Sequence, residues 1–204
     1  MPSSDLKGPV EIIVKNYNFY LELTKEIKCS TGSSITLNTM RRVNDEYYSA
    51  DLSVEHSILQ TPLTLKTTQH RSDTSNFHFI LIAGDFRDKG LHIFRFDSSG
   101  RTHDNPDYYP LVDRQVMVPH FHFFDEHGYN VAYRTQFIVE YSTSNKLPDI
   151  KKFVNHFYDE ARMIHEPGGY PIIRLREDTL PYPQLPFIST PDSRKSDPLR
   201  HAEF

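Results

Sequence analysis

Two histidines separated by one residue, His120 and His122, are the strongest candidates for chemistry in this chain. They lie in the segment 116–124, where apolar and polar residues alternate, and this pattern predicts a β-strand. Side chains two residues apart on a strand project from the same face. The two imidazoles can therefore converge on one metal ion or one phosphate group, or act together as a general acid and base.

Residues that could complete such a site occur shortly before and after the pair. His103 and Asp107 lie in a polar loop upstream, and Glu126 lies in a turn downstream. We expect a catalytic group without a cofactor, in which His103 and Asp107 orient His120 and His122. The alternative is a divalent metal ion bound by His120, His122 and Glu126. Because the chain contains 11 histidines, the pair could also be two ordinary strand residues with no chemical role.

The string His-x-His-x3-Glu, formed by His120, His122 and Glu126, resembles the first metal motif of the cupin barrels. That resemblance implies a metal-binding β-barrel. The sequence departs from the cupin pattern in two respects. No glycine precedes the motif at the usual interval, and no second motif of glycine and histidine follows it.

Two further groups of residues are candidates for binding. Arg95 and Arg101 would form an anion-binding surface for a phosphodiester if the fold brings them to the histidine-bearing face. Tyr182 and Phe187 lie in the extended segment PYPQLPF, whose prolines suit docking in a groove of a partner protein.

Composition and missing motifs exclude several classes of function. The formal charge of −4 provides no broad positive field for binding nucleic acid in bulk, so RNA is a partner only through a local basic patch. The single cysteine, Cys29, allows neither an intramolecular disulfide nor a thiolate metal cluster, which favours the cytoplasm. No membrane partner is expected, because no apolar stretch approaches the length that spans a bilayer. The signatures of serine hydrolases, P-loops and dinucleotide-binding loops do not occur.

The elements that must position these residues follow from periodicity. Apolar residues at helical spacing predict helices over 9–28 and 148–164, and the polar segment 97–112 reads as a surface loop. Alternating segments predict strands at 35–40, 48–55, 63–67, 77–82, 91–96, 116–124, 129–139 and, at an edge, 172–175. We therefore expect an α+β fold, in which an antiparallel sheet of about six to eight strands is flanked by an N-terminal and a C-terminal helix. Residues 1–166 would form one domain, and residues 167–204 an extended or disordered proline-rich tail.

The order of these features resembles a widespread bacterial family of short proteins that is known only as a domain of unknown function. The matching segments are 91–97, 103–107 (His-x-Asn-Pro-Asp), 120–124 (His-x-His) and 148–164, and the resemblance covers residues 10–165. It implies that the His-x-Asn-Pro-Asp loop and the His-x-His strand form a shared centre. It also implies a role in conflict between phage and host, because the genes of such families tend to lie in phage-derived or other mobile regions.

Three hypotheses for function follow. The first is a small cytoplasmic protein of a phage or mobile element that binds a protein or ribonucleoprotein partner, as the charge balance and the proline-rich tail suggest. The alternative is a small, toxin-like ribonuclease in which His120 and His122 act as general acid and base. The second alternative is the cupin-like metal-binding barrel.

Overall fold

The computed structural model describes residues 9–32, 34–39, 46–84, 92–107, 113–144, 146–166 and 168–176. Their helices and strands are α1 (Glu11–Lys15), α2 (Tyr17–Lys25), β1 (Lys28–Thr31), β2 (Ser34–Thr39), β3 (Tyr47–His56), β4 (Leu63–His70), β5 (Phe77–Ala83), β6 (Phe94–Asp97), β7 (His103–Asp104), β8 (Gln115–Val116), β9 (His120–Phe124), β10 (Asn130–Tyr133), α3 (Gln136–Thr143), α4 (Ile150–Glu160), β11 (Met163–Glu166) and β12 (Ile172–Leu175).

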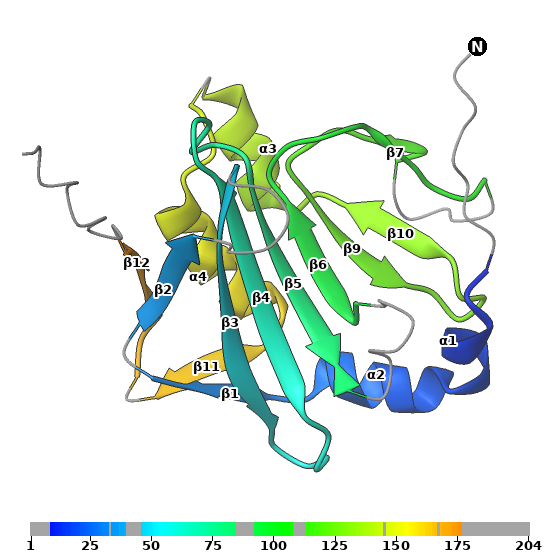
Figure 1. Ribbon diagram of the computed structural model, residues 1–204. Coiled ribbons are helices and arrows are strands. Elements are labelled where there is room, and N and C mark those ends of the chain that lie inside the picture. Colours follow the sequence, from blue (N-terminus) through cyan, green and yellow to red (C-terminus); the bar gives the residue numbers. More distant parts are fainter. Residues whose placement is uncertain are drawn as a thin grey trace, which may run out of the picture.

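One large sheet organises the described part of the chain (Figure 1). Its strands follow the order β10-β9-β6-β5-β4-β3-β1-β11, and β2 pairs with both β3 and β12. Most pairs are antiparallel, whereas β1 with β11 and β2 with β12 are parallel. Strands β7 and β8 form a separate two-stranded ribbon. The expected α+β class with a mainly antiparallel sheet is confirmed.

One face of this sheet is an aromatic core covered by α4. Phe79, Phe96 and Phe121 are opposite one another on β5, β6 and β9. On α4, the ring of Phe153 lies 5.1 Å from that of Phe96, and the ring of Phe157 lies 5.2 Å from that of Phe79. All five side chains are buried, and each such burial stabilises the fold by roughly 1.5–3 kcal/mol. Figure 1 shows α3 and α4 together behind the sheet.

The opposite face of the same strands, which we call the polar face, carries two rows of side chains that cross the sheet. Strand alternation places every residue of these rows on the side away from α4. The rows, read by cross-strand pairing, are His122–Arg95–Ile80–Lys66–Asp51 and His120–Asp97–His78–Thr68–Ser49. Both rows begin on β9 with a histidine of the His-x-His pair.

The N-terminal segment, predicted as one helix over 9–28, forms two helices followed by a strand. The break is at Asn16, whose side-chain amide donates to the Ile12 carbonyl at 2.9 Å. Asparagine competes for backbone groups in this way and interrupts helices. Tyr20 then anchors α2 to the sheet, because its hydroxyl accepts from the Phe124 N–H at 2.7 Å and donates to the Ile93 carbonyl at 2.9 Å.

The segment predicted as a strand over 129–139 is divided between a strand and a helix. Strand β10 ends at Tyr133, and α3 begins at Gln136. Thr135 caps the helix, because its hydroxyl accepts from the Ile138 N–H. The apolar residues after Thr135 belong to α3 rather than to a longer strand.

Other boundaries also differ from those predicted. The polar segment 97–112, expected to be a loop, contains strand β7. The helix predicted over 148–164 ends at Glu160, and Met163–Glu166 form strand β11. The edge strand predicted at 172–175 is confirmed as β12, which pairs with β2. Within the described ranges, no helix is long and apolar enough to cross a membrane.

Candidate active site

Strands β6, β9 and β7 bring one carboxylate and three imidazoles together. Asp97, His120 and His122 each offer one donor atom, and these atoms all lie within 4.8 Å of one another. The rings of His120 and His122 are 4.5 Å apart, measured between centroids. The His103 ring lies 4.8 Å from that of His122 and 6.1 Å from that of His120. We call these four residues the histidine centre.

Asp97 is the most strongly bound member of the centre. Its Oδ1 accepts from His78 Nδ1 and from Arg95 Nε, both at 2.7 Å, and its Oδ2 lies 3.1 Å from His122 Nε2. Burial by itself would raise the pKa of Asp97. The hydrogen bonds of His122 and His78 and the charge of Arg95 outweigh that effect and hold the pKa well below its usual range. Asp97 is therefore a carboxylate at any ordinary pH.

His122 has an oxygen atom on each side of its ring. Nδ1 lies 3.1 Å from Asn130 Oδ1, and Nε2 lies 3.1 Å from Asp97 Oδ2. A neutral imidazole carries one hydrogen, and the two ends of the Asn130 carboxamide, which have the same shape, can either accept from Nδ1 or donate to it. Nε2 can therefore donate to the Asp97 carboxylate or bind a cation shared with it.

His120 and His103 are neutral imidazoles at neutral pH. Burial, and then the proximity of His122, lower the pKa of His120 to about 4 and also lower the pKa of His103. His103 Nε2 donates to the Asn130 carbonyl at 3.0 Å, so its Nδ1 carries the lone pair. His120 Nδ1 is buried and has no hydrogen-bond partner of good geometry among the described residues, although the Met117 backbone raises its pKa slightly.

The lowered pKa of His120 predicts that stability falls as the pH falls from about 6.5 to about 4. In that window the unfolded chain binds a proton that the folded chain excludes, and the free energy of unfolding falls by about 3 kcal/mol. His103 acts in the same direction. Urea denaturation at several pH values, with EDTA present so that only protons compete for the imidazoles, measures this slope. It should flatten in His120→Asn and persist in His127→Asn, which changes an exposed histidine; equal slopes in both variants would contradict this account.

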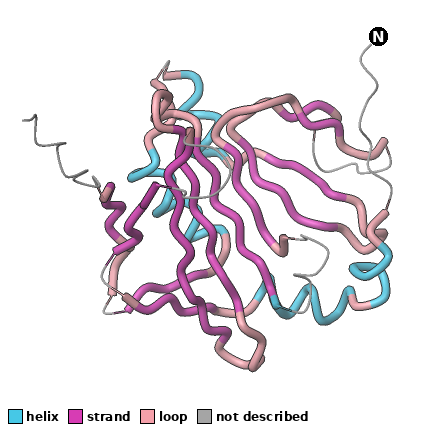
Figure 2. Tube along the Cα trace, in the orientation of Figure 1, coloured by secondary structure: helices cyan, strands magenta, loops and turns pink. Residues whose placement is uncertain are grey.

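The two-stranded ribbon of β7 and β8 lies beside β10 (Figure 2). It carries His103 into the centre and is fastened to β10 by Asn105. The Asn105 side chain accepts from the Ala132 N–H at 2.7 Å and donates to the Ala132 carbonyl at 2.9 Å. It also donates to the Asp113 carbonyl at 2.7 Å. A buried carboxamide thus takes the place of a neighbouring strand along this edge of the sheet. This gives the His-x-Asn-Pro-Asp segment a physical role.

We expect Asn105→Ala to lower the free energy of unfolding by about 2–4 kcal/mol, because the buried N–H and carbonyl of Ala132 lose their partners. The neighbouring variant Asp104→Ala is the matched control, since Asp104 makes one exposed hydrogen bond, to Gln115. Urea denaturation of both variants tests this. A loss in Asn105→Ala no larger than in Asp104→Ala would contradict the assigned role.

The other residues expected in the site lie elsewhere. Asp107 is exposed and pairs with Arg114 at 3.1 Å. Glu126 is exposed in a turn and faces His127 at 3.6 Å, away from the group formed by Asp97, His120 and His122. Arg101 is exposed. Arg95 is the exception: it adjoins the centre, is bound to Asp97 through Nε and is 35% exposed.

The binding residues expected in the tail, Tyr182 and Phe187, lie outside the described residues. Three residues that shape the site were not expected, namely Asp97, His78 and Asn130. His78 and Asn130 lie on predicted strands, and Asp97 directly follows one, but only the pairing register places each beside a histidine. Asp97 is the last residue of the segment LHIFRFD. A carboxylate at the end of a strand rich in aromatic residues was the one feature of the sequence that could have indicated its place in the site.

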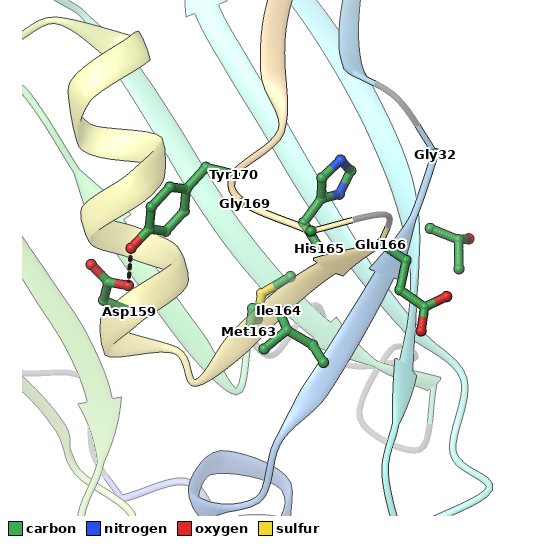
Figure 3. A pocket seen from close by; sticks show the side chains of 10 residues that line it. Gly32, Asp159, Met163, Ile164, His165, Glu166, Gly169 and Tyr170 are labelled. Carbon is green, nitrogen blue, oxygen red and sulfur yellow. Dashed lines mark hydrogen bonds between the residues drawn. The ribbon is translucent and has the colours of Figure 1, made fainter.

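A pocket of about 1070 Å³ lies apart from the centre, between α4, β11 and the turn before β12 (Figure 3). Tyr170 donates to Asp159 across one wall at 2.6 Å. His165, on β11, is buried and hydrogen-bonded through Nδ1 to the Ser30 hydroxyl at 3.2 Å. No residue of the histidine centre lines this pocket.

The fold and the centre together define an α+β protein with a two-histidine, one-carboxylate group on the polar face of a large sheet. No protein-family model, no curated protein and no solved structure matches the chain. The resemblance to a bacterial family of unknown function stays a prediction.

Proposed function

We propose that the protein is a small ribonuclease that cleaves RNA at the histidine centre. The observation that carries this proposal is the convergence of three imidazoles on one buried carboxylate, with Arg95 beside them. Proton transfer and charge neutralisation are what cleavage of a phosphodiester requires, and histidine and arginine are the side chains suited to these tasks.

The side chains on the polar face are suited to binding an extended, negatively charged substrate. Arg95 lies beside Asp97 on β6, and the two rows continue across β5 and β4 with the imidazole of His78, the ammonium group of Lys66 and the hydroxyl of Thr68. They end on β3 with Ser49 and Asp51. Arg95, His78, Lys66 and Thr68 are half-buried, in contrast to the closed aromatic core on the opposite face. A single strand of RNA can lie along such a surface with its phosphates against the cations.

The burial of the individual histidines assigns their roles. His120 and His122 are only 2% and 5% exposed, whereas His103 is half-buried and reaches the centre from the covering ribbon. His103 is therefore the imidazole that a substrate meets first, and its Nδ1 is the proton acceptor. This assignment differs from the expectation that His120 and His122 themselves would be the acid and base.

In the proposed reaction, His103 takes the proton of a ribose 2′-hydroxyl. The 2′-oxygen then forms a bond to phosphorus while the bond from phosphorus to the 5′-oxygen breaks. The departing oxygen takes a proton from water, and the hydroxide that remains is neutralised by the proton on His103. The products are a 2′,3′-cyclic phosphate and a 5′-hydroxyl end. Arg95 neutralises charge on the phosphate during this step, and Asp97 orients Arg95 and His122.

Incubating the protein with end-labelled RNA oligonucleotides, with EDTA or with added zinc, tests this proposal. We expect cleavage by the wild-type chain in at least one of these conditions and none by a folded His122→Ala variant. Intact RNA in both conditions would overturn the proposal. The competing hypothesis, partner binding through the proline-rich tail, depends on residues outside the described ranges and has no described contact in its favour. A toxin-like ribonuclease also suits the mobile-element setting that the family resemblance implies.

A further inference from the structure

We infer that Asp97, His120 and His122 bind one divalent transition-metal ion, of the kind that prefers imidazole and carboxylate ligands, such as zinc. The binding itself needs no substrate, whereas the role of the ion in catalysis rests on the proposed ribonuclease function. This ligand set differs from the one expected from sequence, because Asp97 takes the place of Glu126.

The donor atoms are spaced as ligands of one ion. Zinc binds imidazole nitrogen and carboxylate oxygen at about 2.0–2.2 Å, so two ligands of one ion lie about 3–3.5 Å apart. His122 Nε2 and Asp97 Oδ2 are 3.1 Å apart. All three donor atoms lie within 4.8 Å of one another.

The surrounding hydrogen bonds orient these ligands as outer partners do in metal sites. Arg95 and His78 both bind Oδ1 of Asp97 and leave Oδ2 to face the histidines. When Nδ1 of His122 donates to Asn130 Oδ1, the lone pair of Nε2 faces Asp97 and is available to a metal; without a metal, Nε2 can instead donate to Asp97. Asp97 and His122 are thus both held through atoms that a metal would not use.

Two features suit a cation at this point. His122 Nε2 and Asp97 Oδ2 face each other at 3.1 Å in a buried place, and a cation bound by both would neutralise the carboxylate. Independently, His120 is 98% buried, and its Nδ1 has no partner of good geometry within the described ranges.

The ligand types select among metals. Calcium and magnesium prefer six or more oxygen ligands, and this group offers only one carboxylate. Two imidazoles and one carboxylate suit zinc and its neighbours in the first transition series. Three protein ligands leave a position open, as in catalytic rather than structural zinc sites. In the proposed reaction the ion would hold a phosphate oxygen beside His103, as a Lewis acid.

The test is equilibrium binding of zinc and cobalt to EDTA-treated, dialysed protein, by titration calorimetry and by the visible absorption of bound cobalt. We expect one equivalent to bind with a dissociation constant below about 1 μM. Binding should weaken at least about 100-fold in His122→Ala and in Asp97→Asn. Glu126→Gln and His127→Ala are the matched controls and should bind as the wild type does. Circular dichroism shows whether each variant is folded.

Two outcomes overturn the inference. One is wild-type protein that binds neither metal, and the other is binding that persists in the folded Asp97→Asn and His122→Ala variants. The ribonuclease proposal fails separately. Metal binding without RNA cleavage would support the metal site and contradict the ribonuclease function. RNA cleavage by a protein that binds no metal would support the ribonuclease function and contradict the metal site. His103→Gln should bind metal normally, because His103 is not in the ligand group.

Discussion

Replacing His103 with glutamine is expected to lower the rate of RNA cleavage by about 10²–10⁴-fold, the usual contribution of a general base. Glutamine can still donate a hydrogen bond to the Asn130 carbonyl, as His103 Nε2 does, but it cannot accept a proton. The fold should therefore be retained while the proton acceptor is lost. Single-turnover cleavage of a labelled RNA gives the rate.

The matched control for this variant is His127→Gln, which changes an exposed histidine next to the predicted ligand Glu126. Its cleavage rate should equal that of the wild type. A His103→Gln variant that is folded and cleaves within about threefold of the wild-type rate would show that His103 is not the proton acceptor.

Replacing Asp97 with alanine is expected to lower the free energy of unfolding by about 3–5 kcal/mol. The substitution removes the shared hydrogen-bond partner of His78, Arg95 and His122 and leaves the charge of Arg95 without its carboxylate. Urea denaturation in EDTA measures the loss without a contribution from metal binding.

The comparison for Asp97→Ala is Asp107→Ala. Asp107 also pairs with an arginine, Arg114, but both side chains are about three-quarters exposed, and such pairs contribute about 0–1 kcal/mol. Similar losses in the two variants would mean that the Asp97 cluster contributes no more than an exposed ion pair. The contrast between the two carboxylates therefore tests the importance of burial directly.

Local patterns in the sequence predicted the parts of the fold that depend on periodicity. The alternation around His120 and His122 identified β9, and the apolar spacing around Phe153 and Phe157 identified α4. The N-terminal break could not be read in this way, because a single hydrogen bond from the Asn16 side chain divides the segment. Similarly, apolar residues continue past Tyr133, and only the cap made by Thr135 ends the extended segment.

The candidate site was less accessible to sequence reasoning than the fold. Proximity along the chain suggested Asp107 and Glu126 as partners of the histidines, but both are exposed at turns. The carboxylate that does join them, Asp97, is placed opposite His120 by the register of β6 and β9. Register is set by long-range pairing, and a shift of one residue would turn Asp97 to the other face. No local pattern contains that information.

The most direct measurement of the central claim uses a DNA oligonucleotide that contains one ribonucleotide. If the histidine centre removes the proton of a 2′-hydroxyl, the wild-type protein should cut this strand only on the 3′ side of the ribose. The product should carry a 2′,3′-cyclic phosphate, and His103→Gln should leave the strand whole. Cleavage at deoxyribose positions, or an intact strand after prolonged incubation with wild-type protein and zinc, would contradict the account.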